Sequence, residues 1–439
     1  MPSLRHRAQT VAKRLLDAGF TTYFAGGCVR DQLLGNKPKD YDIATSATPT
    51  EVLQLFPNGN SIGAHFGVIL VKEEGYHFEI ATFRTDGSYS DGRKPESVTF
   101  STPEEDAQRR DFTINGLFQN PLTGEVIDFV NGQSDLQTRT LRAIGEPKLR
   151  FQEDSLRLLR AVRFATKLDF KIHPETADAI RENAAGLQRI SPERIRDEFS
   201  QIITHSRRVF GIRKLVELNL IDHFLPEVRT LIGCEQPPQW HPEGDVFEHT
   251  MIALDLLGET DDLTLCLATL LHDIAKPPTQ TFDEADNRIR FNGHDALGAE
   301  MTGEILRRLK YSNKIQEDAS FIVSRHMQFM NVTKMRMAKV RRFMASPVFE
   351  KEMELHRVDC ASSNGFTENY DFLRRKEEEF AAEPLIPKPL VTGKDLIDLG
   401  LSPGPTFKEL LQEVQTLQLE GSVATRAEAL EVIKGKLSS

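Results

Sequence analysis

The chain is 439 residues long. This is too long for one hydrophobic core and predicts about three domains or modules. The apolar fraction of 39% and the charged fraction of 27% are ordinary for a soluble globular protein. The sequence lacks the long apolar run that a membrane span needs, and its N-terminal segment predicts an amphipathic helix, not a signal peptide. Its four cysteines show no CxxC spacing, which argues against a cysteine zinc site and favours a reducing cytoplasm.

Charge is distributed unevenly along the chain. The net charge of −10 argues weakly against a nucleic-acid partner. However, residues 136–171 carry nine Lys or Arg against four Asp or Glu, and residues 334–342 form a second basic stretch. Local patches, not net charge, neutralise a phosphate backbone. A nucleic-acid partner therefore stays open, with a solvated helix face as the alternative for each patch.

The N-terminal part predicts a mixed α/β domain, and the remainder is predominantly helical. The elements expected in residues 1–145 are an N-terminal helix, strand Tyr23–Ala25, a glycine turn with a short helix, strand Tyr41–Thr45, a helix starting at Thr48 and Pro49, and strands near Gly67–Lys72 and His77–Arg84. Proline-rich breaks near residues 236–243 and 383–389 divide the helical remainder. The predicted parts are therefore residues 1–145, 146–235, 236–382 and 383–439. Within the first part, Asp86–Arg93 is rich in Gly and Ser and predicts a mobile loop.

The glycine turn precedes an arginine. Gly26 and Gly27 allow backbone N–H groups to approach a phosphate closely, and Arg30 can neutralise one of its charges. In the later segment QRRDFTINGL, Asp111 is expected to cap the helix that follows, which would direct Arg110 toward phosphates or a ribose. Helix capping combined with a surface charge is the alternative interpretation of this segment.

Two acidic residues on the second expected strand carry the strongest catalytic signal. Asp40 and Asp42 project from the same face, with Tyr41 on the other. Two adjacent carboxylates repel each other unless a cation lies between them, and hard oxygen ligands suit Mg²⁺. Glu79, on the polar face of the strand Tyr76–Phe83, is a candidate third carboxylate. Solvated acidic residues on strands are the alternative.

The segment EDSLRLLRAVRF predicts the most informative helix. Asp154, Arg157, Arg160 and Arg163 recur every three residues and so lie along one surface of that helix. A carboxylate accepts from the amino group that cytosine and adenine share, and a guanidinium donates to the neighbouring ring nitrogen. Uracil and guanine present the reverse order, so an Asp–Arg pair favours C and A by about 1–3 kcal/mol. A row of surface salt bridges is the alternative.

The motifs GGxVRD with DxD, RRDFTINGL and EDxxR resemble the class II nucleotidyltransferases, which comprise CCA-adding tRNA nucleotidyltransferases and bacterial poly(A) polymerases. The resemblance implies a mixed α/β head of the DNA polymerase β superfamily type, followed by an all-α neck, a helical domain and a helical tail. It implies template-independent addition of C and A to tRNA 3′ ends from CTP and ATP, with release of diphosphate. Two Mg²⁺ ions would be held by Asp40 and Asp42, while Asp154 and Arg157 would select the nucleotide.

Further segments match the same family. The segment SPERIRDEF resembles the motif that braces the base-reading helix, and residues 390–437 resemble the tail that clasps the tRNA elbow, although by composition this tail is equally a packing cap. The resemblance also implies that Asp86–Arg93 helps the switch from C to A, and that Arg160 and Arg163 support the base-reading pair or contact phosphate.

A second group of polar residues lies in the predicted helical part. The four members on predicted helices with apolar neighbours are His249, His272, Asp273 and Asp359. They can converge on a bundle interior as a metal site. Their order, H…HD…D, resembles the HD phosphohydrolase superfamily, which implies a divalent transition metal that activates water for phosphoester cleavage. For His294 and His326, three interpretations stay open: they bind a second metal, they contact phosphate, or they are core histidines with satisfied hydrogen bonds.

Several functions stay open beside CCA addition. The chain could be a poly(A) polymerase or add only CC or only A, although Ile62–Val68 lacks the Arg-rich stretch associated with the poly(A) branch. It could also be an HD phosphohydrolase with a degenerate head, or a tRNA-binding protein without catalysis. The sequence predicts no oligomeric state.

Overall fold

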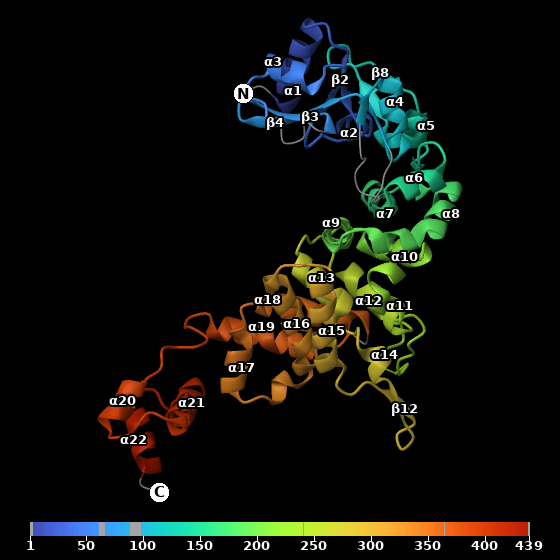
Figure 1. The fold of residues 1–439 in the computed structure, drawn as a ribbon. Helices are drawn as coiled ribbons and strands as arrows, with labels where there is room; N and C mark the ends of the chain where they lie inside the picture. The colour runs from blue at the N-terminus through green and yellow to red at the C-terminus, as the bar shows by residue number, and fades with distance from the viewer. Residues whose placement is uncertain (1–2, 61–65, 88–97, 240, 364, 438–439) are drawn as a thin grey trace. The chain divides into compact units, whose positions relative to one another are not determined.

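The structure is a computed structural model that describes residues 3–60, 66–87, 98–239, 241–363 and 365–437 (Figure 1). The chain forms two compact units, Met1–Arg229 with Arg308–Tyr311, and Thr230–Arg307 with Ser312–Ser439. The predicted fold class is confirmed, because a mixed α/β part precedes a helical remainder. Most of the predicted loop Asp86–Arg93, and most of the segment Ile62–Val68, lie outside the described residues.

The α/β part of the first unit is built around one six-stranded sheet. In chain order its elements are α1 (Leu4–Asp17), β1 (Thr22–Ala25), α2 (Gly27–Leu33), β2 (Asp42–Thr45), α3 (Pro49–Leu55), β3 (Val68–Glu73), β4 (Tyr76–Thr82), β5 (Arg84–Asp86), β6 (Val98–Phe100), α4 (Pro103–Gln108), the 3-10 turn η2 (Thr113–Asn115), β7 (Leu117–Gln119), β8 (Val126–Asp128), α5 (Gly132–Gln137) and β9 (Thr140–Leu141). The sheet order is β3-β4-β2-β1-β7-β8. The predicted helix start is confirmed, since the Thr48 side chain caps α3 and Pro49 occupies its first turn.

Strand register places the acidic residues in relation to the glycine turn. β2 pairs antiparallel with β1, with Ala25 opposite Asp42, and parallel with β4, with Ile43 opposite Ile80. Asp42 therefore lies at the end of β1 where the chain turns through Gly26. β2 begins at Asp42, so Asp40 precedes the strand, which corrects the prediction of a strand through both acids.

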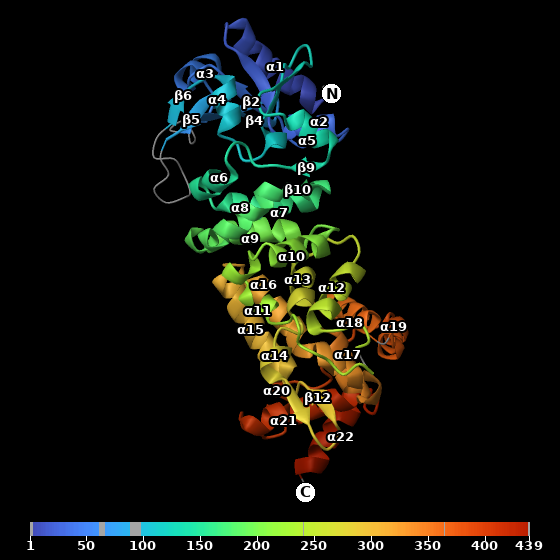
Figure 2. The ribbon, with the colours of Figure 1, turned by 90° about the vertical axis from the view of Figure 1, so that its right-hand side faces the viewer.

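The rest of the first unit is helical. Its elements are α6 (Pro147–Glu153), α7 (Leu156–Leu168), β10 (Lys171–Ile172), α8 (Pro174–Asn183), the 3-10 segment η3 (Ala184–Arg189), α9 (Pro192–Ile203), α10 (Arg208–Glu217), η4 (Ile221–His223) and α11 (Pro226–Arg229). α7 packs against both α9 and α10 (Figures 1 and 2). The apolar side predicted for α7 is buried, including Leu159 and Val162.

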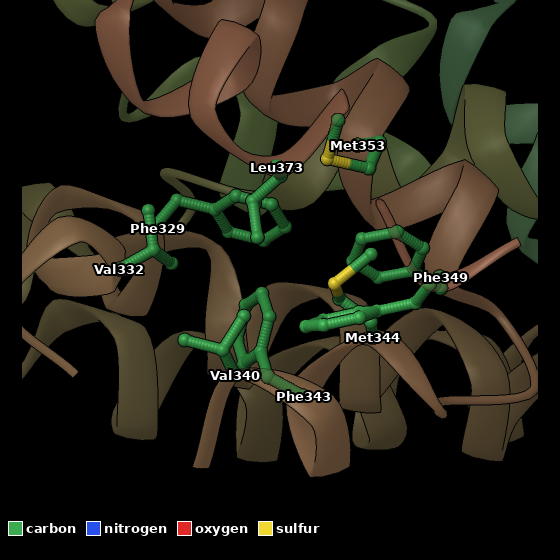
Figure 3. Close-up of a cluster of buried hydrophobic side chains, with 9 residues drawn as sticks. Phe329, Val332, Val340, Phe343, Met344, Phe349, Met353 and Leu373 are labelled. Atoms are coloured by element: carbon green, nitrogen blue, oxygen red, sulfur yellow. The ribbon is translucent and has the colours of Figure 1, made fainter. Parts of the chain in front are cut away.

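The second unit is a helical bundle with one small hairpin. Its elements are α12 (Val246–Leu256), α13 (Leu263–Leu271), α14 (Lys276–Thr279), β11 (Thr281–Asp283), β12 (Arg288–Arg290), α15 (His294–Arg308, whose last residue belongs to the first unit), α16 (Asn313–Arg325), η5 (His326–Lys334), α17 (Met337–Met344), α18 (Phe349–Ser362), α19 (Glu368–Phe380), α20 (Gly393–Asp398), α21 (Pro405–Leu419) and α22 (Arg426–Leu437). α12 packs on α18, and α13 packs on α16. Phenylalanine and methionine side chains from η5, α17 and α18 fill one core, which includes Phe329, Phe343 and Met353 (Figure 3).

The last three helices have their own small core. Val391, Leu396, Val414 and Ile433 are among its buried members. This agrees with a helical module punctuated by Gly and Pro, as the sequence predicts. Within the described residues, no helix has the length and apolar character needed to cross a membrane.

Candidate functional site

A cavity of about 790 Å³ in the first unit gathers residues from distant segments. The predicted residues on its wall are Gly26, Gly27, Arg30, Asp40, Asp42, Arg110, Asp154, Arg157, Arg160 and Arg163. They come from the glycine turn, the start of β2, the segment after α4, and α7 with the residues before it. The fold therefore brings the acidic pair and the arginine-bearing helix to one cavity.

The two acids share one side of the chain, as the alternation predicts. Asp40 and Asp42 are exposed, and Tyr41 between them is buried against Phe24, with ring centroids 5.0 Å apart. Partial removal from water, together with the Asp40 and Glu79 carboxylates, raises the pKa of Asp42 to about 6. Asp40 and Asp42 form no ion pair with any described residue. A divalent cation fits here, because it would offset this repulsion and its ligands would be hard oxygens.

Glu79 lies on β4 beside this pair. Phe78 and Ile80 are buried and Glu79 is exposed, which confirms the predicted face. Because Ile43 and Ile80 are partners in the parallel register, Glu79 lies one position along from them, at the level of Asp42. Glu79 is not part of the cavity wall, so its closeness to Asp42 is the observation that keeps it a candidate.

The glycine turn has a steric reason for glycine at one position. Gly26 has a φ of 69°, and a Cβ there would lie 2.9 Å from Arg110 Nη1. Arg110 Nη2 donates to Asp106 Oδ2 at 3.0 Å, and Arg110 Nη1 donates to the Asn115 carbonyl at 3.2 Å. Arg30 is held in a similar way, by Asp31 and by the Asn115 side chain. Both arginines therefore line the cavity in fixed positions.

The predicted helix from Glu153 to Phe164 is interrupted. α6 ends at Glu153, α7 begins at Leu156, and Asp154 lies between them with extended backbone. Its Oδ1 accepts a hydrogen bond from the Leu156 amide at 2.9 Å, and Arg194 of α9 lies 3.3 Å from its Oδ2. The prediction that four residues lie on one continuous helix is therefore wrong for Asp154, the first of them.

The arginines of α7 pair with acidic residues outside the predicted row. Arg157 pairs with Glu153, not with Asp154, at 2.7 Å between Nη1 and Oε2. Arg160 pairs with Asp111 and Arg163 with Glu198 of α9. The segment SPERIRDEF therefore does contact the helix that it was predicted to brace, through Glu198, and Arg194 contacts Asp154 just before that helix.

Asp111 does not cap a helix as expected. Its Oδ1 accepts from the Phe112 amide and from Asn115 Nδ2, while Oδ2 accepts from Arg160. η2 follows, and its first residue has no side-chain cap. The sequence reasoning also missed Asp106, which pairs with both Arg109 and Arg110; its spacing of three and four residues before them was the available signal.

A second cluster lies in the second unit, where the predicted histidines and aspartates converge. His249 Nε2 lies 3.1 Å from Asp359 Oδ1 and 3.3 Å from His272 Nε2. His272 Nε2 lies 3.2 Å from Asp273 Oδ2. Three of these four residues, His249, His272 and Asp273, form a compact group of ligand-type atoms. Asp359 Oδ1 also lies 3.8 Å from His272 Nε2.

The two further histidines join this cluster through Asp273. His294 Nε2 lies 3.5 Å from Asp273 Oδ1 and 3.2 Å from His326 Nε2. The three form a second compact group of ligand-type atoms. A core histidine with all its partners satisfied would not direct Nε2 at a carboxylate and another Nε2, so the geometry favours a role in ligand binding.

Hydrogen bonding leaves the same ring nitrogen, Nε2, of three histidines for a ligand. The Nδ1 atoms of His272, His294 and His326 lie 2.6 to 2.8 Å from backbone carbonyl oxygens, to which Nδ1–H donates. His249 Nδ1 lies 2.8 Å from Glu243 Oε1. In the neutral rings of His272, His294 and His326, Nε2 then carries the lone pair, which is the arrangement of a metal-binding imidazole. The residues present therefore fit a divalent metal.

The surroundings shift the pKa values of this cluster's residues in different directions. Burial opposes a charge on His249, but hydrogen bonds to Asp359 and Glu243 outweigh it and raise its pKa to about 9. Burial and the neighbouring His272 lower the pKa of His326 to about 4. Burial also opposes ionisation of Asp273, yet His272 and Lys276 hold its pKa well below the usual range. Asp273 is therefore an anionic centre between the two groups.

Three residues near this cluster were missed by the sequence reasoning. Glu243 accepts hydrogen bonds from both His241 and His249, and Lys276 Nζ lies 2.7 Å from Asp273 Oδ2. A cavity of about 400 Å³ opens on the cluster and is lined by His241, Lys276 and others. Lys276 begins α14 three residues after Asp273, and this spacing was a usable signal. His241 and Glu243 lie in a proline-rich segment without periodicity and carried none.

Family comparisons define the class of protein. A model of the poly A polymerase head domain matches residues 22–142, a model described as a probable RNA and SrmB-binding site of polymerase A matches residues 169–231, and the HD domain model matches residues 245–360. The chain is thus a nucleotidyltransferase-type protein with an HD domain.

Full-length relatives narrow this class. The CCA-adding enzyme of Streptococcus suis is 31% identical over 441 residues, covering 100% of this chain and 98% of that protein. That of Limosilactobacillus reuteri is 39% identical over 261 residues, and the match covers 58% of this chain and 64% of the relative. The crystal structure of Bacillus stearothermophilus CCA-adding enzyme in complex with CTP matches all of both chains with a TM-score of 0.75 and 27% identity. The chain belongs to the CCA-adding enzyme family.

Proposed function

We propose that this protein adds C and A residues to the 3′ end of tRNA from CTP and ATP and releases diphosphate. The observation that carries the proposal is that Asp40, Asp42, Asp154 and Arg157 line one cavity although they come from separate segments. The similarity to a full-length enzyme that was solved with CTP supports it.

The reacting groups would meet at the acidic pair. Asp40 and Asp42 would hold Mg²⁺, with Glu79 as an additional negative charge at the same level of the sheet. Bound Mg²⁺ would supply activation of the 3′-hydroxyl and neutralisation of the diphosphate leaving group. Gly26 and Gly27 leave room for phosphate, and Arg30 and Arg110, held by their own partners, would contact phosphates and ribose.

The base would be read by groups that are already oriented. Asp154 is held by Arg194, and Arg157 is held by Glu153. Asp154 and Arg157 can still bind a base while they are held by these partners, because a carboxylate has about four acceptor sites and a guanidinium has five donors. Asp154 would accept from the amino group of C or A, and Arg157 would donate to the ring nitrogen. Arg160 and Arg163 act as supports, since both are engaged with Asp111 and Glu198.

The resemblance to the same family also suggests a role for each predicted part of the chain. Residues 1–145 would be the catalytic head, 146–235 the neck that reads the base, 236–382 the HD domain and 383–439 the tail that binds tRNA. The role of Asp86–Arg93 in the switch from C to A stays a prediction. The reaction on tRNA favours a cytoplasmic enzyme, and so does the absence of disulfide bonds among the four cysteines that the structure describes.

The decisive experiment is extension of tRNA with each nucleotide separately. Transcripts ending at the discriminator base, at C or at CC would be incubated with CTP, ATP, UTP or GTP, and product length read on a gel. CCA addition predicts two C from CTP and one A from ATP after CC. Long A tails from ATP alone would instead establish a poly(A) polymerase. Asp40→Ala with Asp42→Ala should abolish incorporation, and retained incorporation would refute the proposed site.

The HD cluster supports a second activity, metal-dependent phosphoester hydrolysis. The observation that favours it is the set of histidines whose Nε2 atoms converge on Asp273 and Asp359. The bound metal would activate water, and Asp273 and the histidine Nε2 atoms would be its ligands. His272→Ala should abolish hydrolysis of phosphoesters and leave nucleotide addition unchanged. Hydrolysis that persists in this variant would contradict the assignment.

A further inference from the structure

The cationic residues on the wall of the head cavity fall into two groups. Every arginine there has an acidic partner within the protein. The pairs are Arg30 with Asp31, Arg109 and Arg110 with Asp106, Arg157 with Glu153, Arg160 with Asp111, Arg163 with Glu198, and Arg194 with Asp154. The charge of each arginine is therefore largely offset before any ligand enters.

Three lysines on the same wall differ from the arginines. Lys37 and Lys39 lie in the exposed loop between α2 and β2, and Lys167 lies in the last turn of α7. In the part of the chain that the structure describes, none of the three side chains forms a hydrogen bond or an ion pair. They are the uncompensated positive charges of this cavity wall among the described residues.

Lys167 also lies near other positive charges of the same cavity wall, including Lys39. Burial and the nearby Arg30 lower the pKa of Lys167, and the charges of Arg163 and Lys39 lower it further. Asp31 opposes this shift, but Asp31 is already paired with Arg30. A positive patch of this kind is stabilised when an anion approaches it.

The position of the patch distinguishes between the two anions of the reaction. The nucleotide must lie within the cavity, between the acidic pair and Asp154, where the arginines are. The RNA strand must bring its 3′ end to the same acids and then leave the cavity toward solvent. Lys37 and Lys39 are exposed on the cavity wall, and Lys39 directly precedes Asp40. Flexible lysines at an exposed edge suit a phosphate backbone that needs charge without fixed geometry.

We propose that Lys37, Lys39 and Lys167 bind the backbone phosphates of the RNA strand near the 3′ end that is extended. The inference rests on the proposed nucleotidyl transfer, and it assigns to these lysines a positioning role for the RNA and not for the nucleotide. None of the three takes part in the chemical step.

The test compares single variants Lys37→Gln, Lys39→Gln and Lys167→Gln, and the triple variant, with Lys72→Gln. Lys72 is an exposed lysine of β3 outside the cavity wall and forms no side-chain pair within the described residues, so it is a matched control for the loss of one charge. The dissociation constant of tRNA would be measured by filter binding over a series of NaCl concentrations. KM values for tRNA and for CTP would be measured separately.

Each single substitution should lower the slope of log affinity against log salt concentration by about 1 and weaken tRNA binding several-fold, with about 3 units of slope lost in the triple variant. KM for tRNA should rise while KM for CTP stays unchanged, and Lys72→Gln should match wild type. A rise in KM for CTP alone would assign the lysines to the triphosphate, and unchanged slopes would refute the patch. Wild-type protein that extends no RNA would refute the proposed function instead, while the binding slopes would still report on the lysines.

Discussion

Arg160 of α7 donates two hydrogen bonds to one carboxylate oxygen of Asp111, from Nε at 2.9 Å and from Nη2 at 2.6 Å. Asp111 is buried, and its other oxygen accepts from the Phe112 amide and from Asn115. Asn115 in turn contacts Arg30 and Arg110. The pair therefore ties the base-reading helix to the groups beside the glycine turn.

This ion pair should make stability depend on acidity. Burial opposes ionisation of Asp111, but Arg160 and Asn115 outweigh it and lower its pKa to about 2, below the value of about 3.9 in an unfolded chain. The stabilisation is then fully present above about pH 4 and is lost as the pH falls toward 2. Asp111→Asn should lower the free energy of unfolding by about 2 kcal/mol at pH 7. Denaturant unfolding at pH 7, 4 and 3 would check this, and a difference from wild type that does not shrink with acidity would contradict it.

The pair of Arg163 and Glu198 should be costly to break on one side only. Both side chains are buried, and Arg163 Nε lies 2.5 Å from Glu198 Oε2. Glu198→Ala leaves a buried guanidinium without its partner and should cost about 3–5 kcal/mol, while an apolar replacement of both residues should recover much of that loss. Denaturant unfolding of the single and double variants would measure it. Equal losses in both variants would show that packing, not the unpaired charge, dominates.

Nucleotide choice should depend on Asp154. Asp154→Asn replaces one acceptor by a donor, so the preference for CTP over UTP should fall by about 10- to 100-fold. The ratio of kcat/KM for the two nucleotides on tRNA is the measurement. Asp178→Asn, at an exposed position of α8, is the control and should keep the wild-type ratio. An unchanged ratio in Asp154→Asn would remove this residue from base reading.

Metal affinity of the HD cluster should depend on Glu243. Its carboxylate holds the Nδ1 side of His249, so Glu243→Gln should weaken metal binding by about 10- to 100-fold without removing a ligand. Calorimetric titration with divalent metals would measure the affinity, and His272→Ala gives the reference for loss of a ligand. Glu259→Gln, at an exposed position, is the matched control. Wild-type affinity in Glu243→Gln would show that His249 needs no such support.

Local sequence patterns correctly predicted which way a side chain points where that depends on a single strand or helix. The alternation around Tyr41 and the polar face of Glu79 follow from the two-residue period of a strand, and both are seen. In contrast, the break at Asp154 replaced a continuous helix, because the Asp154 side chain hydrogen-bonds the backbone amide of Leu156. That competition between side chain and helix is not visible in residue spacing.

The amino-acid sequence by itself determined the chemistry available to this protein: paired carboxylates beside a glycine turn, a row of arginines, and histidines and aspartates spread over helices. Only the tertiary structure decided the partner of each charge. Arg157 took Glu153, Arg160 took Asp111 and Arg163 took Glu198, which left the cavity lysines uncompensated. The physical reason is that an ion pair depends on distance in space, and distance between residues far apart in the chain is set by the packing of the sheet and helices that carry them.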